Sequence, residues 1–277
     1  MPDQPASDSV ETLLDDMLQD VGHSALKYST WKNTVLSAFL GTTGSDYQNE
    51  LMIVGRALNG NNGTWLPPEM QDQARRSEVV ENAAHQWDNR GLNWVLKYWK
   101  QIRACEDCQE NYFGRKSQCP KCRSSKTKRL YCTRTSAFWR VIRHVVRNIP
   151  FPESLWDTWA NHVAWTNLYK ISPSGGGNPT TSLRQLQHPY CEQILRLEIQ
   201  AWQPRRILFL SGYDWMNHFC EGLGIAGQIT ENAKFVQFAG TLTSTGAKVV
   251  VGPHPQDRGA KPERDFAKEI ATYFRQS

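Results

Sequence analysis

The stretch "LMIVGRALNGNNG", residues 51–63, joins a short apolar run to a loop rich in glycine and asparagine. An apolar run of this length is typical of a strand that is buried on both faces. Glycine lets a backbone come close to another group, and loops placed by a rigid strand often carry function. The stretch therefore predicts a buried strand that ends at a binding site.

Similar apolar runs recur along the chain and alternate with amphipathic segments. The further predicted strands are 162–168 ("HVAWTNL"), 205–212 ("RRILFLSG"), 235–242 and a last one within 247–259 ("AKVVVGPHPQDRG"). The predicted helices cover residues 9–40, 76–102, 136–147, 182–202 and 262–275. This alternation predicts an α/β fold whose mostly parallel sheet is covered on both faces.

Polar residues follow several of these strands at the point where each strand ends. They are Asn59, Asn167, the pair Ser211–Gly212, and His254. Sheets of this class bind ligands at the carboxyl ends of their strands. We therefore expect these residues, distant in sequence, to lie along one edge of the sheet and form a site.

Length and composition set the broad class of the protein. The chain has 277 residues, of which 39% are hydrophobic and 21% charged, as in ordinary folded domains. No apolar run is long enough to cross a bilayer, and the first twenty residues lack the features of a signal peptide. We expect a cytoplasmic protein without a membrane partner, with a helical segment at 1–45 and an α/β domain at 46–277.

Positive charge is concentrated in one segment. Residues 101–134 contain nine Lys or Arg residues against three acidic ones, although the net charge of the whole chain is only +5. Such a segment favours a polyanion such as DNA as a partner, although many charge runs are simply solvated surface. The basic residues that we expect to reach phosphates are Arg115, Lys116, Lys121, Arg123, Lys126, Lys128 and Arg129.

The same segment carries two CxxC pairs. Cys105, Cys108, Cys119 and Cys122 have the spacing of a tetrahedral zinc site, in which each tight turn supplies two thiolates. A disulfide pair and an iron–sulfur cluster are the competing interpretations. Four thiolates leave no open position on the metal, so we expect a structural Zn²⁺ in a zinc-ribbon insertion at 103–132. Nothing in the sequence predicts a protein partner.

Three motifs together resemble the uracil-DNA glycosylase superfamily. They are "IVGRALNGN" after the first strand, "AWTNLYKISP" after the second and "VVGPHPQDRG" after the last. The resemblance covers residues 50–75 and 135–277 and omits the ribbon. It implies a three-layer sandwich around a central, mostly parallel sheet of four strands, and a DNA glycosylase activity. The four cysteines of the superfamily's iron–sulfur branch have no counterparts at matching positions.

The resemblance also implies roles for individual residues. Asn59 matches the residue that positions the attacking water, although the spacing from Gly55 differs and the role could fall to Asn61 or Asn62. Asn167 matches the amide that reads the edge of the base. His254 matches the histidine that stabilises the departing base. The "QDRG" that follows departs from the usual serine, and we expect Arg258 to contact a DNA phosphate.

The substrate is less closely defined. Uracil-specific members of the superfamily carry an aromatic residue in the first loop, and no aromatic lies between Gly55 and Gly63. A roomier pocket favours a pyrimidine with a bulky polar group, and the preferred substrate is glucosylated 5-hydroxymethylcytosine of phage DNA. Repair of uracil or another deaminated base is one alternative, and a non-catalytic nucleic-acid-binding protein is another. Each residue also has a plain structural interpretation: the asparagines as turn residues, Asn167 as a loop-stabilising side chain and His254 as a buried, hydrogen-bonded histidine.

Overall fold

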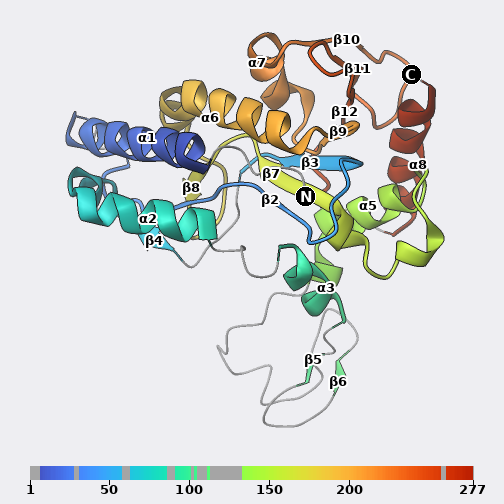
Figure 1. Ribbon diagram of the computed structural model, residues 1–277, viewed down its shortest axis with the longest axis horizontal. Helices are drawn as coiled ribbons and strands as arrows, with labels where there is room; N and C mark the ends of the chain where they lie inside the picture. Colours follow the sequence, from blue (N-terminus) through green and yellow to red (C-terminus); the bar gives the residue numbers. More distant parts are fainter. Residues whose placement is uncertain are drawn as a thin grey trace.

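The computed structural model describes residues 7–27, 31–57, 63–85, 91–100, 103–104, 111–112, 133–256 and 260–276 (Figure 1). Seven α-helices lie within them: α1 (Ser7–Lys27), α2 (Gln73–His85), α3 (Asn93–Lys100), α5 (Ala137–Val146), α6 (Thr181–Trp202), α7 (Tyr213–Leu223) and α8 (Ala260–Gln276). The short 3-10 helices are η1 (Pro67–Gln71), η2 (Thr133–Thr135), η3 (Glu153–Leu155) and η4 (Trp159–His162). None of these described helices is both long enough and apolar enough to span a membrane.

A seven-stranded sheet forms the centre of the fold, in the order β10-β11-β12-β9-β3-β7-β2. Its strands are β2 (Thr42–Thr43), β3 (Leu51–Gly55), β7 (Val163–Asn167), β9 (Arg206–Phe209), β10 (Ile225–Ile229), β11 (Phe238–Leu242) and β12 (Lys248–Val251). The neighbouring pairs β12–β9, β9–β3 and β3–β7 are parallel, whereas β10–β11, β11–β12 and β2–β7 are antiparallel.

The expected α/β class is confirmed, but the expected sheet of four strands was too small. The sheet is mixed. Its parallel centre is extended by the antiparallel hairpin β10–β11 at one edge and by the short strand β2 at the other. Most of β10 is exposed and β2 has only two residues, so neither carries the apolar run that predicts a buried strand. Edge strands of this kind leave a weak signal in sequence.

Two smaller sheets complete the strands. A three-stranded antiparallel sheet has the order β4-β1-β8, and its strands are β1 (Leu36–Ala38), β4 (Thr64–Trp65) and β8 (Ile171–Pro173). The pair β5 (Arg103–Ala104) and β6 (Asn111–Tyr112) is also antiparallel. It lies in the segment predicted as a zinc ribbon, most of which is outside the described residues.

The predicted helix at 9–40 was wrong beyond Lys27. The helix α1 ends there, and Leu36–Ala38 is strand β1 instead. A short apolar run such as 35–40 does not show by periodicity alone whether it is a helix or a strand. The predicted helix at 76–102 likewise corresponds to two described helices, α2 and α3.

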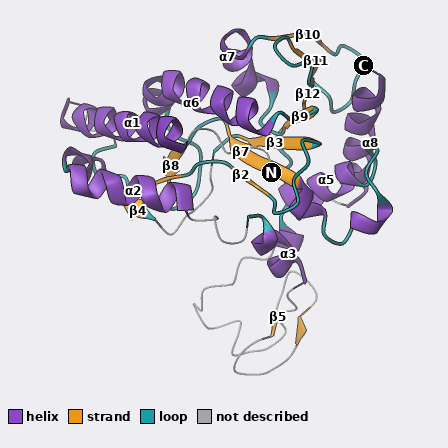
Figure 2. Ribbon diagram, in the orientation of Figure 1, coloured by secondary structure: helices purple, strands orange, loops and turns teal. Residues whose placement is uncertain are grey.

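Helices cover both faces of the central sheet (Figure 2). Side chains alternate along β3, so Met52 and Val54 join one hydrophobic cluster while Leu51 and Ile53 join the other. The first cluster contains residues of α1, α6 and α7, and the second contains residues of α3, α5 and α8. Burial on both sides explains why β3 is apolar at every position before Gly55.

The parallel strands end together at one edge of the sheet. In the register, Gly55 lies opposite Asn167, and Phe209 lies opposite both Val54 and Val251. Backbone hydrogen bonds continue past these ends: Leu168 N–H donates to Gly55 O over 2.9 Å. The segments that follow β3, β7, β9 and β12 are therefore held side by side.

Candidate functional site

Asn167 is the last residue of β7 and is buried at this edge, with only 2% of its surface exposed. Its Nδ2 atom is buried and has no hydrogen-bond partner within the described residues. Leaving a buried amide donor unpaired costs about 1–3 kcal/mol. A ligand with an acceptor atom would remove that cost, so the side chain is suited to binding one.

Gly55 makes the space that the Asn167 side chain occupies. A Cβ atom at position 55 would lie 2.2 Å from Asn167 Oδ1, far inside van der Waals contact. The glycine that ends β3 is therefore required by a neighbouring side chain, and its φ angle is not in the left-handed region. This explains the abrupt end of the apolar run in the sequence.

His254 follows β12 and lies at the same edge. Its Nδ1 atom is buried and also lacks a hydrogen-bond partner in the part of the chain that the structure describes. Its ring is stacked on Phe138 of α5, with ring centroids 6.1 Å apart and an interplanar angle of 22°. Phe138 also lies 3.7 Å from the place that a Cβ of residue 55 would take. Phe138 is thus a common neighbour of Gly55 and His254.

Burial, and to a lesser extent the nearby positive charge of Arg56, together lower the pKa of His254 to about 4. The imidazole is therefore neutral near pH 7. A neutral imidazole carries one N–H donor and one acceptor nitrogen. Its N–H can therefore donate a hydrogen bond to a group that gains negative charge.

Arg56 is a site residue that the sequence analysis missed. It follows Gly55 directly, its Nε–H donates to Ser211 O, and its guanidinium lies 5.2 Å from the ring centroid of Trp215. A Cβ at Gly212, whose φ is +85°, would lie 3.3 Å from an Arg56 nitrogen. The predicted edge residues Ser211 and Gly212 therefore hold Arg56. Its position at the carboxyl end of a buried strand was the available signal.

A buried ion pair fixes the backbone around Asn167. Lys170 Nζ donates to Glu198 Oε2 over 2.8 Å, and Thr166 Oγ1 donates to the same oxygen over 2.8 Å. Lys170 and Thr166 are fully buried, and Glu198 is 2% exposed. The network ties the end of β7 to α6, so Asn167 projects from a rigid support.

The remaining predicted site residues lie outside the described residues. These are Asn59, Asn61, Asn62, the cysteines Cys105, Cys108, Cys119 and Cys122, and the basic residues Arg115, Lys116, Lys121, Arg123, Lys126, Lys128, Arg129 and Arg258. Within the described ranges, no three or more His, Cys, Asp or Glu side chains cluster in a way that could hold a metal ion. The zinc site remains a prediction from cysteine spacing.

Comparison of the sequence with known protein families and with curated proteins finds no match. The resemblance to the uracil-DNA glycosylase superfamily therefore remains a prediction from the three motifs. The geometry of the strand ends is independent of that resemblance.

Proposed function

We propose that the protein is a DNA glycosylase, which binds a flipped-out pyrimidine at this edge of the sheet and hydrolyses its N-glycosidic bond. The observation that carries the proposal is that Asn167 and His254 each bring a buried nitrogen without a hydrogen-bond partner in the described structure to the same edge of the sheet. Asn167 is buried and His254 is half-buried, and the His254 ring stacks on Phe138. Enzymes that act on a base must take it out of the stack and recognise its edge in a pocket.

The bond that breaks joins C1′ of the sugar to a nitrogen of the base. Positive charge develops on the sugar and negative charge on the departing base. The neutral His254 donates a hydrogen bond to an oxygen of the pyrimidine, where this negative charge gathers. Water supplies the hydroxyl group on C1′, and its proton goes to the base or to solvent. In the superfamily pattern, Asn59 orients this water.

Asn167 recognises the base. Its Nδ2 donates to an acceptor on the Watson–Crick edge, and its Oδ1 can accept from a base amino or imino group. Phe138 supplies an apolar wall, which keeps water from the hydrogen bonds that distinguish one base from another. The proposed zinc has a structural role in this mechanism and takes part in no step.

DNA is the proposed partner because of charge. Besides the basic segment at 101–134, Arg143 of α5 and Arg147 at the end of that helix lie close enough to repel each other electrostatically. The pKa of Arg143 is lowered by burial and by Arg147 and Arg134, while Asp157 opposes this. Cations held this close together favour a polyanion, which offsets their repulsion.

The proposed substrate is glucosylated 5-hydroxymethylcytosine in phage DNA, which makes antiphage defence the proposed role. The absence of an aromatic residue between Gly55 and Gly63 supports the choice. The first test incubates the protein with DNA that carries cytosine, uracil or the glucosylated base, and then detects alkali-labile abasic sites. Cleavage of the modified DNA alone supports the defence role, and cleavage of the uracil strand alone supports repair.

Variants at Asn167 connect the activity to the site. Asn167→Ala should reduce excision at least tenfold, because a missing hydrogen bond to a bound group costs about 1.5 kcal/mol or more. Asn82→Ala, at an exposed position of α2, is the matched control. If no DNA yields abasic sites while DNA still binds, the protein is a binding protein and the catalytic proposal is wrong.

A further inference from the structure

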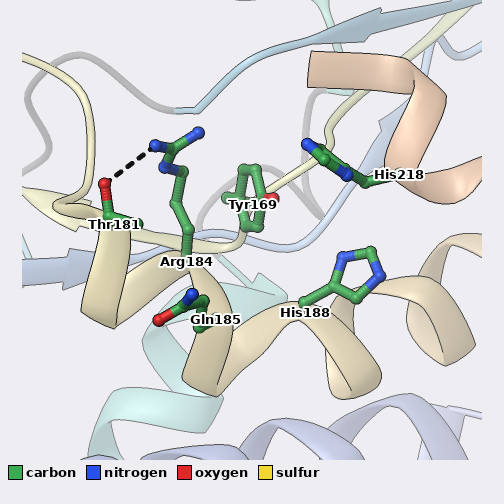
Figure 3. Close-up of a pocket in the computed structure, with 6 residues that line it drawn as sticks. All are labelled: Tyr169, Thr181, Arg184, Gln185, His188 and His218. Carbon is green, nitrogen blue, oxygen red and sulfur yellow. Dashed lines mark hydrogen bonds between the residues drawn. The ribbon is translucent and has the colours of Figure 1, made fainter. Parts of the chain in front are cut away.

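A pocket lies next to the candidate site, between the first half of α6 and α7 (Figure 3). Its volume is about 460 Å³, and it is lined by Tyr169, Thr181, Arg184, Gln185, His188 and His218. This volume falls in the range of pockets that hold small ligands or parts of larger ones. The lining residues include a guanidinium and two imidazoles but no carboxylate.

Arg184 supplies the positive charge. Its Nη2 donates to Thr181 Oγ1 over 3.1 Å, and its Nε is buried with no hydrogen-bond partner within the described residues. Its guanidinium lies 4.6 Å from the ring centroid of Trp215. No carboxylate of the described residues forms an ion pair with it. The aromatic ring therefore orients a guanidinium whose hydrogen-bonding capacity is only partly used.

Two histidines stand across the pocket from Arg184, on the other side of the Tyr169 ring (Figure 3). His188 packs edge-on against Phe219, with ring centroids 4.6 Å apart, and its Nδ1 is buried and unpaired in the described structure. His218 comes from α7 and is exposed. Glu192 acts on His188 electrostatically, and its carboxylate pairs with Arg196 over 3.1 Å. The pocket lining itself thus offers hydrogen-bond donors and contains no carboxylate.

Trp215 connects this pocket to the candidate site. Its ring contacts the guanidiniums of both Arg184 and Arg56, and it packs edge-on against Tyr169 at 5.7 Å. Arg56 in turn lies close enough to His254 to influence its charge. A ligand that places a base beside His254 therefore has a neighbouring group within reach of Arg184.

We propose that this pocket binds a backbone phosphate of the DNA strand that carries the flipped nucleotide, with Arg184 as the main contact. A guanidinium, a hydroxyl, an amide and imidazole N–H groups are the donors that proteins direct at phosphate oxygens. The positive end of the α6 dipole, at whose first turns Thr181 and Arg184 lie, adds to the attraction. The inference rests on the proposed function for the identity of the strand.

Salt dependence of DNA binding tests the proposal. Each phosphate contact contributes about 0.9 to the slope of log affinity against log salt for duplex DNA, and about 0.7 for single strands. Arg184→Gln should weaken binding and reduce the slope by about that amount. Arg184→Lys keeps the charge and should keep most of the slope. Arg275→Gln, a variant of an exposed arginine at the C-terminal end of α8, should leave affinity and slope unchanged.

A second arm distinguishes the source of the phosphate. Inorganic phosphate is added at constant ionic strength, and thermal unfolding of the wild type and of Arg184→Gln is compared. If phosphate stabilises only the wild type and the DNA slopes are equal, the pocket holds a small phosphate ligand and the DNA assignment is wrong. Equal slopes without any phosphate effect also overturn it.

Abasic-site formation is measured on the same samples. If excision proceeds and the slope of Arg184→Gln is unchanged, the pocket proposal fails while the glycosylase proposal stands. If no abasic sites form and the salt slope still falls with Arg184→Gln, the pocket proposal stands while the glycosylase proposal fails. The two proposals can therefore fail separately.

Discussion

Gly55→Ala is the substitution that most sharply tests the geometry of the site. The added Cβ would lie 2.2 Å from Asn167 Oδ1, and ordinary contact begins near 3.4 Å. The oxygen therefore has to move by about 1.2 Å, and a shift of roughly 1 Å in a catalytic arrangement can cost about a hundredfold in rate. The Asn167 backbone cannot follow, because β7 is paired with β3 in the sheet.

The expected result is a loss of excision of about a hundredfold with a modest loss of stability. Overpacking a buried position costs about 1–3 kcal/mol in free energy of unfolding, which a stable domain tolerates. Excision under single-turnover conditions and urea denaturation measure the two effects. Gly175→Ala is the control, because nothing lies within 4 Å of a Cβ there. Wild-type excision and stability in Gly55→Ala would refute the assigned role of this glycine.

Three further predictions concern stability and the metal. Lys170→Met leaves the Glu198 carboxylate buried without its cation. This substitution should lower the free energy of unfolding, measured by urea denaturation, by about 3–5 kcal/mol. The double variant Lys170→Met, Glu198→Leu should recover most of the lost stability. Burial and the nearby Arg56 lower the pKa of His254 to about 4, so as pH falls the unfolded chain takes up the proton before the folded one, and stability should decrease between pH 6.5 and 4. His254→Gln should make that decrease shallower, and an unchanged slope would contradict the assigned pKa. Elemental analysis should find one zinc per chain, and Cys105→Ser should lose it, whereas zinc retention by that variant would exclude the predicted ligand set.

The strands that form the centre of the sheet could be predicted because they are buried on both faces. Leu51–Gly55 and Val163–Asn167 are buried at every position, so each begins with a run of apolar residues, which stops at Gly55 in the first strand and at Thr166 in the second. Parallel strands end at the same edge, and the structure places Asn167 and His254 there as predicted from the alternation of elements. Their roles in chemistry remain predictions.

Other parts of the site depend on contacts that no local pattern records. Phe138 lies in an amphipathic helix, where an aromatic residue looks like ordinary core, and only the packing of α5 brings it to His254. Trp215 belongs to α7, a helix that was not predicted, and its stacking with Arg56 and Arg184 joins three distant segments. The strand β1 was mistaken for helix because a short apolar run fits either structure.

The proposed role of a neutral His254 in stabilising the departing base can be tested by substitution. Wild type, His254→Ala and the control His23→Ala, an exposed histidine of α1, are assayed on the same modified DNA for abasic-site formation and for affinity. Only His254→Ala should lose rate, by about 10²- to 10³-fold, as when one donor to a developing negative charge is removed, and its affinity for DNA should be retained. Excision by His254→Ala at the wild-type rate would show that His254 does not have this role.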